Sequence, residues 1–161
     1  MRMSAALPLL LWSTGAQALT CLPPDVAATY REAAESTDRY TVVVGALTFD
    51  ETQLPVTDMA NQQNTPPETR IAARLTGEAL TRAGFTFPYD REITLNAQCF
   101  GPWCAGAVSG AEYLAFVNLD RAVPEVAITP CGGFAFGQPT EAMRQRVIAC
   151  FNGGDCVPEG R

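Results

Sequence analysis

The chain contains no histidine and no lysine, and all eleven of its basic residues are arginine. Histidine is the most frequent general base, the commonest zinc ligand, and the group that activates serine or cysteine nucleophiles. Lysine is the residue that forms Schiff bases. These kinds of chemistry are therefore excluded, and we expect neither a metal nor a cofactor. Catalysis would have to rest on carboxylates or on a thiol.

Long apolar runs are also missing, because a membrane-spanning helix needs about 20 apolar residues and no stretch reaches that length. The longest run, residues 5–12, follows Arg2 and precedes Ala16-Gln17-Ala18. A positive charge, a short apolar run and a small-residue cleavage site are typical of a signal peptide. We therefore predict that residues 1–18 are a signal peptide and that the exported protein begins at Leu19, without a membrane anchor.

Positive charge is scarce, since the formal net charge is −6. This balance disfavours binding to nucleic acid or to an anionic membrane surface. Residues 19–161 have the size of one domain, which commonly comprises about 100 to 150 residues. From the short signal and the arginine-only composition we infer a bacterial envelope protein, either periplasmic or secreted.

What the sequence does contain is six cysteines, all beyond the predicted cleavage site: Cys21, Cys99, Cys104, Cys131, Cys150 and Cys156. In an oxidising compartment an even number of cysteines indicates disulfides, although six allow fifteen connectivities. Short loops favour Cys99 with Cys104 and Cys150 with Cys156, which leaves Cys21 for Cys131. A redox role for Cys99 and Cys104 is disfavoured, because such pairs usually have two residues between them and four intervene here.

Alternation of apolar residues predicts strands over residues 40–49, 71–79, 93–99 and 125–131, with Gly45 as a bulge or bend. A continuous apolar run predicts a buried strand over residues 112–118. Turns are expected near Gly84 and at Pro88-Tyr89-Asp90. Residues 50–68 are polar and rich in proline, which indicates an exposed loop. Helical spacing and cap residues predict a short helix over residues 25–36, capped by Asp25, and a second over residues 139–152.

Five curved strands with a short N-terminal helix and a C-terminal helix favour a mostly β fold, a small Greek-key barrel of the OB-fold type. A β-sandwich is the alternative.

Several short pieces then resemble one family, in this order: residues 20–24 (Thr-Cys-Leu-Pro-Pro), residues 43–45, Cys99, residues 112–116, residues 128–131 and the helix that ends at Cys150. Together they resemble the N-terminal domain of tissue inhibitors of metalloproteases and the wider netrin-like OB-fold group. The resemblance implies a disulfide-stapled barrel, a protein partner, and a bridge between Cys21 and Cys131. In the inhibitors, a cysteine two places earlier chelates the target's zinc. This chain has Leu19 there, which argues against metalloprotease inhibition.

We therefore expect a non-catalytic binding module whose partner is an extracytoplasmic protein. The N-terminal segment, pinned beside the Cys99 loop, is expected to form the contact edge, with Leu19, Thr20, Leu22, Pro23, Phe100 and Trp103 as its residues. Trp103 has two interpretations, an interface anchor of the kind that dominates protein interfaces or a side chain that covers the barrel, and we favour the second. The alternative function is a small extracytoplasmic enzyme that uses a reactive thiol or a carboxylate, with Glu112, Asp90 and Glu92 as candidates.

Overall fold

A computed structural model describes residues 19–159 of the chain. The predicted signal peptide, residues 1–18, lies outside the described residues. Within the described part, no helix has the length and apolar character that crossing a membrane requires. The fold is mostly β, with a sheet of eight strands and two α-helices.

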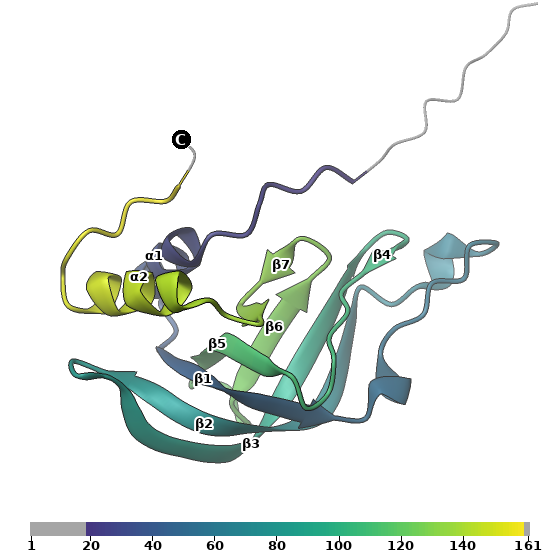
Figure 1. Cartoon of the computed structure of the whole chain (residues 1–161). Coiled ribbons are helices and arrows are strands. Elements are labelled where there is room, and N and C mark those ends of the chain that lie inside the picture. The colour runs from purple at the N-terminus through teal and green to yellow at the C-terminus, as the bar shows by residue number, and fades with distance from the viewer. Residues whose placement is uncertain (1–18, 160–161) are drawn as a thin grey trace, which may run out of the picture.

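The elements follow one another along the chain as shown in Figure 1. They are α1 (Val26–Glu35), β1 (Tyr40–Phe49), two 3-10 turns (Glu51–Gln53 and Gln62–Asn64), β2 (Glu68–Thr81), β3 (Gly84–Phe100), β4 (Trp103–Cys104), β5 (Glu112–Asn118), β6 (Glu125–Thr129), β7 (Gly132–Gly133), β8 (Ala135–Gly137) and α2 (Glu141–Phe151). The five expected strands and both expected helices are therefore present. The structure adds β4, β7 and β8, each only two or three residues long.

The five longer strands pair in a closed circuit. β1 lies antiparallel between β2 and β5, and β2 pairs with β3. β3 then pairs in parallel with β6 from Thr94↔Glu125 to Ala97↔Ile128, and β6 returns to β5 through the pair Asn118↔Glu125. The parallel β3–β6 pair places the C-terminal ends of both strands at the same end of the circuit.

Apolar side chains form two clusters. One fills the interior of the circuit and contains fully buried residues such as Leu47, Leu75 and Leu95. The other lies on the outer face of β1 and β5, where the two helices cover Phe116 and Val44. In Figure 1 both helices lie on this one side of the strands, so the rest of the outer surface has no helical cover.

The sequence suggested that Gly45 is a bulge or a bend. It is neither, because the β1–β2 register runs through it without a break. It faces Gly77 on β2 instead. A Cβ atom on Gly45 would lie 2.3 Å from the carbonyl oxygen of Thr76, and one on Gly77 would lie 2.1 Å from that of Val44. Both positions are glycine because the two backbones approach too closely for any side chain. The β2–β3 register shift lies elsewhere, at Ala79/Leu80.

The expected turn at Pro88-Tyr89-Asp90 is also wrong, because these residues lie inside β3. The β2–β3 turn is formed by Arg82 and Ala83, and Gly84 follows it with a φ of +100°. Pro88 pairs with Glu78 on β2, and β3 has no second neighbour until Thr94. Proline is tolerated in a strand where its missing N–H faces no partner strand.

Both helices begin as their cap residues predict. The Asp25 carboxylate accepts hydrogen bonds from Ala27 N at 2.8 Å and Ala28 N at 2.9 Å. The Thr140 hydroxyl accepts one from Met143 N at 3.2 Å. These bonds satisfy backbone donors that have no partner within the first turn of a helix.

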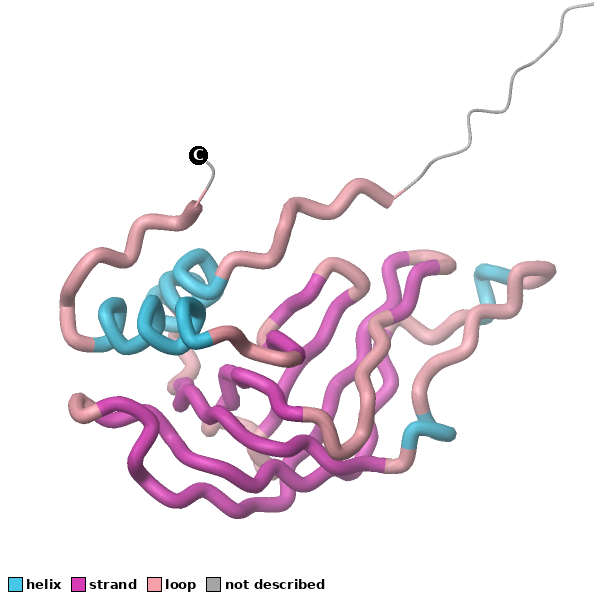
Figure 2. Tube along the Cα trace, viewed as in Figure 1, coloured by secondary structure: helices cyan, strands magenta, loops and turns pink. Residues whose placement is uncertain are grey.

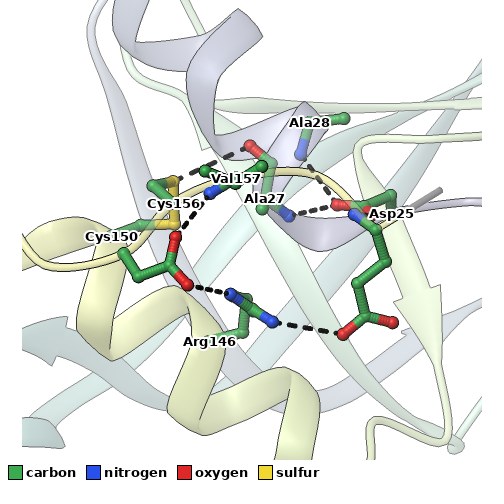
Figure 3. The surroundings of a disulfide bond; sticks show 9 residues. Asp25, Ala27, Ala28, Arg146, Cys150, Cys156 and Val157 are labelled. Carbon is green, nitrogen blue, oxygen red and sulfur yellow. Dashed lines mark hydrogen bonds and ion pairs between the residues drawn. A yellow bond between two sulfur atoms is a disulfide. The ribbon is translucent and has the colours of Figure 1, made fainter. Parts of the chain in front are cut away.

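All six cysteines form disulfides, in the three pairs that were expected: Cys21–Cys131, Cys99–Cys104 and Cys150–Cys156. The third pair holds the C-terminal segment against the first turn of α1 (Figure 3), where the Cys156 sulfur lies 3.9 Å from the Ala27 carbonyl oxygen.

Candidate functional site

The N-terminal segment lies on the turn between β6 and β7. Cys21 is joined to Cys131, which is in that turn, with 5.2 Å between the two Cα atoms. A Cβ atom on Gly132, whose φ is +113°, would lie 3.2 Å from the Pro24 Cβ. The disulfide and this close contact fix where the segment crosses the turn. Leu19 is half-buried, whereas Thr20, Leu22 and Pro23 are exposed.

The Cys99–Cys104 disulfide closes a second turn, between β3 and β4. The two cysteines are directly opposite in the ladder, and so are the next residues outward, Phe100 and Trp103. Gly101 has a φ of +60°, a left-handed backbone conformation that suits glycine in a tight hairpin turn. The turn is therefore held by a covalent bond at its base and presents two aromatic side chains near its tip.

The loop over residues 50–67 packs against this hairpin. The Thr57 hydroxyl donates to the Pro102 carbonyl at 2.6 Å, and Cys99 N donates to the Pro67 carbonyl at 2.9 Å. The loop was expected to be exposed, and most of its residues are. Glu68, the last residue of the expected loop, is instead the first residue of β2.

The two turns lie at the same end of the circuit, because β3 and β6 run in parallel and each turn follows the C-terminal end of one of them. Figure 1 shows the N-terminal segment, the β6–β7 turn and the β3–β4 turn together at this end. The N-terminal segment and the Cys99–Cys104 hairpin therefore lie at the same end of the strand circuit, as the loops and strands of Figure 2 also show.

Five large apolar side chains are exposed on these segments. We call them the apolar edge: Leu22 (85 % exposed), Val56 (86 %), Met59 (68 %), Phe100 (43 %) and Trp103 (39 %). Trp103 is only partly exposed, so its exposure fits both of the interpretations given from the sequence. Val56 and Met59 were not foreseen, because single apolar residues within a polar loop carry no periodic signal.

The segments that carry the apolar edge contain acidic residues and no basic ones. Residues 19–25, 50–67 and 99–104 contain Asp25, Asp50, Glu51 and Asp58 but no arginine. Hydrogen bonds from Thr52 and Gln53 lower the pKa of Asp50, and hydrogen bonds from Asn61 and Ala60 lower that of Asp58. Asp50 and Asp58 are therefore ionised at neutral pH, and the charged side chains of these segments are all carboxylates.

Two of the carboxylates proposed for the alternative enzyme lie on one face of β3, and the third is on another strand. Glu92 is directly opposite Arg74 of β2, and Asp90 is bound by the same Arg74 and by Thr76. These hydrogen bonds lower the pKa of the Asp90 carboxyl group, the opposite of what a general acid needs. Glu92 lines an open surface hollow with Arg70 and Arg74. Glu112 accepts a hydrogen bond from Arg144 at 2.6 Å on the outside of β5.

A reactive thiol is excluded in the oxidised protein, because no cysteine of the described chain is free. Among residues 19–159 there is also no group of three or more side chains placed to hold a metal ion.

Comparison of the chain with models of protein families, with curated proteins and with solved structures finds no match in any of the three.

Proposed function

We propose that the protein is an exported, non-catalytic module that binds another protein through its apolar edge. The observation that carries this proposal is the exposure of Leu22, Phe100 and Trp103. Leu22 is next to Cys21, which a disulfide anchors to the β6–β7 turn, and the two aromatic residues lie in a turn that a second disulfide closes. Aromatic side chains held on rigid elements lose little conformational freedom on binding and dominate protein interfaces.

The charge pattern indicates the kind of partner. Charged residues around an interface act through complementary potentials, which steer the encounter and exclude partners of the same sign. Since the segments that carry the apolar edge hold only carboxylates, a suitable partner has an apolar patch surrounded by basic residues.

We further propose that the strand circuit is an OB-fold barrel, similar to that of the tissue inhibitors of metalloproteases and the netrin-like group. Support comes from five long strands in one closed circuit with a single parallel pair, β3–β6. The Cys21–Cys131 bridge is the one that the resemblance implies. Metalloprotease inhibition is not part of the proposal, since Leu19 stands where the inhibitors have their chelating cysteine.

The test is a capture experiment with matched variants. The oxidised protein is immobilised and exposed to an extracytoplasmic extract of its source, and retained proteins are identified by mass spectrometry. The same is done with Leu22→Ser, with Trp103→Ser, and with Phe151→Ser as control. Phe151 is 42 % exposed, close to the 39 % of Trp103, but lies on α2 away from the apolar edge.

We expect a protein that the wild type and Phe151→Ser retain and that both edge variants release. A substitution at a central aromatic contact typically costs about 2 kcal/mol or more, which weakens binding about thirtyfold. Retention of nothing specific, or of a protein that all three variants hold equally, would contradict the proposal.

A further inference from the structure

A cavity of about 330 Å³ opens at the other end of the strand circuit from the apolar edge. It is lined by Thr41, Ala79, Phe87, Pro88, Tyr89, Arg91, Leu119 and Pro124. Its volume is at the lower limit of the range that is usual for small-molecule sites, about 300 to 1,000 Å³.

The strand register shows that this cavity is a mouth of the barrel interior. Phe87, Tyr89 and Arg91 alternate along β3, and they pair with Ala79, Gly77 and Leu75 of β2. Side chains that alternate along a strand share one face, and Leu75 and Ala79 are buried in the interior cluster. The three β3 side chains therefore face the interior side of the sheet, although Phe87 is 63 % exposed.

The interior is open here because β3 lacks its second neighbour. The parallel pairing with β6 begins only at Thr94, where the Thr94 N–H also donates to the Pro124 carbonyl at 2.8 Å. Before that point the connection between β5 and β6 takes the place of a strand and contributes Leu119 and Pro124 to the cavity. The result is an opening with apolar walls.

Arg91 is the only charged residue that lines the cavity. None of the ion pairs within residues 19–159 includes it. The neighbouring residue Asp90 points to the opposite face of the sheet, where it binds Arg74 and Thr76. The guanidinium of Arg91 is therefore available to an anion at the mouth of the cavity.

Tyr89 also lines the cavity, but its hydroxyl is not open to it. The residue is 7 % exposed, and its hydroxyl oxygen is fully covered and has no hydrogen-bond partner among the described residues. A ligand in the cavity cannot reach a covered oxygen, so Arg91 is the group that can bind an anion there.

We propose that this cavity binds a small carboxylic acid with an apolar body, such as a medium-chain alkanoate. The carboxylate receives charge-assisted hydrogen bonds from the guanidinium of Arg91. The alkyl chain lies against Phe87, Leu119 and Pro124, which removes its apolar surface from water. The site is independent of the apolar edge, and nothing in this proposal depends on the protein partner.

The test uses octanoate as the probe and the oxidised protein at neutral pH. Binding is measured by isothermal titration calorimetry, and the site is located by two-dimensional amide NMR. Octan-1-ol tests the need for the carboxylate, and acetate tests the need for the chain. Arg91→Gln removes the cation. Arg82→Gln is the control, because Arg82 also forms no ion pair but lies in the β2–β3 turn, outside the cavity lining.

We expect saturable octanoate binding that shifts the amide signals of Tyr89, Arg91 and Leu119. Arg91→Gln is expected to weaken it at least tenfold, because it removes the positive charge and the charge-assisted hydrogen bonds that the carboxylate accepts. Arg82→Gln is expected to bind as the wild type does, and octan-1-ol and acetate to bind much more weakly. No saturable binding, equal affinity of Arg91→Gln and wild type, or signal shifts outside the cavity would overturn the proposal.

Discussion

The backbone N–H of Glu159 donates a hydrogen bond to a carboxylate oxygen of Asp25 at 2.6 Å, although the two residues are 134 positions apart in the sequence. Asp25 also caps α1, and Arg146 on α2 lies 3.2 Å from carboxylate oxygens of both Asp155 and Glu159. Figure 3 labels Asp25 and Arg146 near the Cys150–Cys156 disulfide. The carboxylate of Asp25, in the N-terminal segment, thus binds both the first turn of α1 and the C-terminal segment.

This arrangement predicts a pH dependence. Burial by itself raises the pKa of Asp25, but hydrogen bonds from Ala28, Glu159 and Ala27 outweigh it, so the pKa is lowered. A carboxyl group whose pKa is lower in the folded state stabilises the fold above its unfolded pKa of about 3.9, and the effect is lost as the pH falls below that value.

Asp25→Asn keeps the oxygen that caps α1, removes the charge, and replaces the oxygen that accepts from Glu159 N with an amide donor. We expect the variant to be less stable than the wild type by about 0.5 to 1 kcal/mol at pH 7, the usual contribution of a negative charge at a helix N-terminus. The difference should shrink below pH 4. Urea unfolding at pH 7 and pH 3 measures it, and an equal difference at both pH values would show that the charge has no role.

The three disulfides should contribute unequally to stability. Cys21–Cys131 closes a loop with a sequence separation of 110, whereas the separation is 5 for Cys99–Cys104. Loop-closure entropy gives about 5 kcal/mol for the first and about 2 kcal/mol for the second. Urea unfolding of the double variants Cys21→Ser/Cys131→Ser and Cys99→Ser/Cys104→Ser is expected to preserve this order. The reverse order would mean that the short bridge is needed for native packing.

Gly45 and Gly77 should tolerate no side chain, because the backbones of β1 and β2 approach too closely there. Gly45→Ala places a methyl group 2.3 Å from a backbone oxygen, which cannot move without breaking the ladder. We expect a loss of about 3 kcal/mol or more in the free energy of unfolding. Gly106→Ala is the control, because nothing lies within 4 Å of its added Cβ and its stability should change by less than about 0.5 kcal/mol. A small effect of Gly45→Ala would contradict the close approach.

Tyr89→Phe tests the unused hydroxyl without any ligand. Removing a buried polar group that has no partner should leave the free energy of unfolding unchanged or raise it by up to about 1 kcal/mol. Thermal unfolding and urea unfolding both measure this. A loss of more than about 1 kcal/mol would show that the hydroxyl is hydrogen-bonded in the folded protein.

Much of the fold was predictable because local signals agree with it. Asp25 follows two prolines and precedes a helical repeat, so α1 could be predicted from its cap. β1 has the β-branched composition of a strand, and its observed bounds are those predicted. The disulfides could be predicted from the spacing of the cysteines. Two short loops accounted for four of the six, which left Cys21 and Cys131 as the third pair. Pro88 was misleading, because whether a proline fits a strand depends on which neighbours the strand has.

The candidate sites were predictable only in part. Leu22, Phe100 and Trp103 stood out because they adjoin cysteines, whereas Val56 and Met59 gave no signal within a polar loop. The Arg91 cavity could not be foreseen. It depends on where β3 begins to pair with β6, and the register of two strands so far apart in the sequence is set by packing rather than by either segment alone.

Site-specific photocrosslinking tests the central claim of a protein-binding edge most directly. A photoreactive phenylalanine analogue replaces Trp103 in one variant and Phe151 in another, and both are irradiated in intact cells of the source. The account predicts a discrete crosslinked protein at Trp103 that is absent at Phe151 and is lost when Leu22→Ser is added. The absence of a crosslink at Trp103, or the same product from both positions, would contradict it.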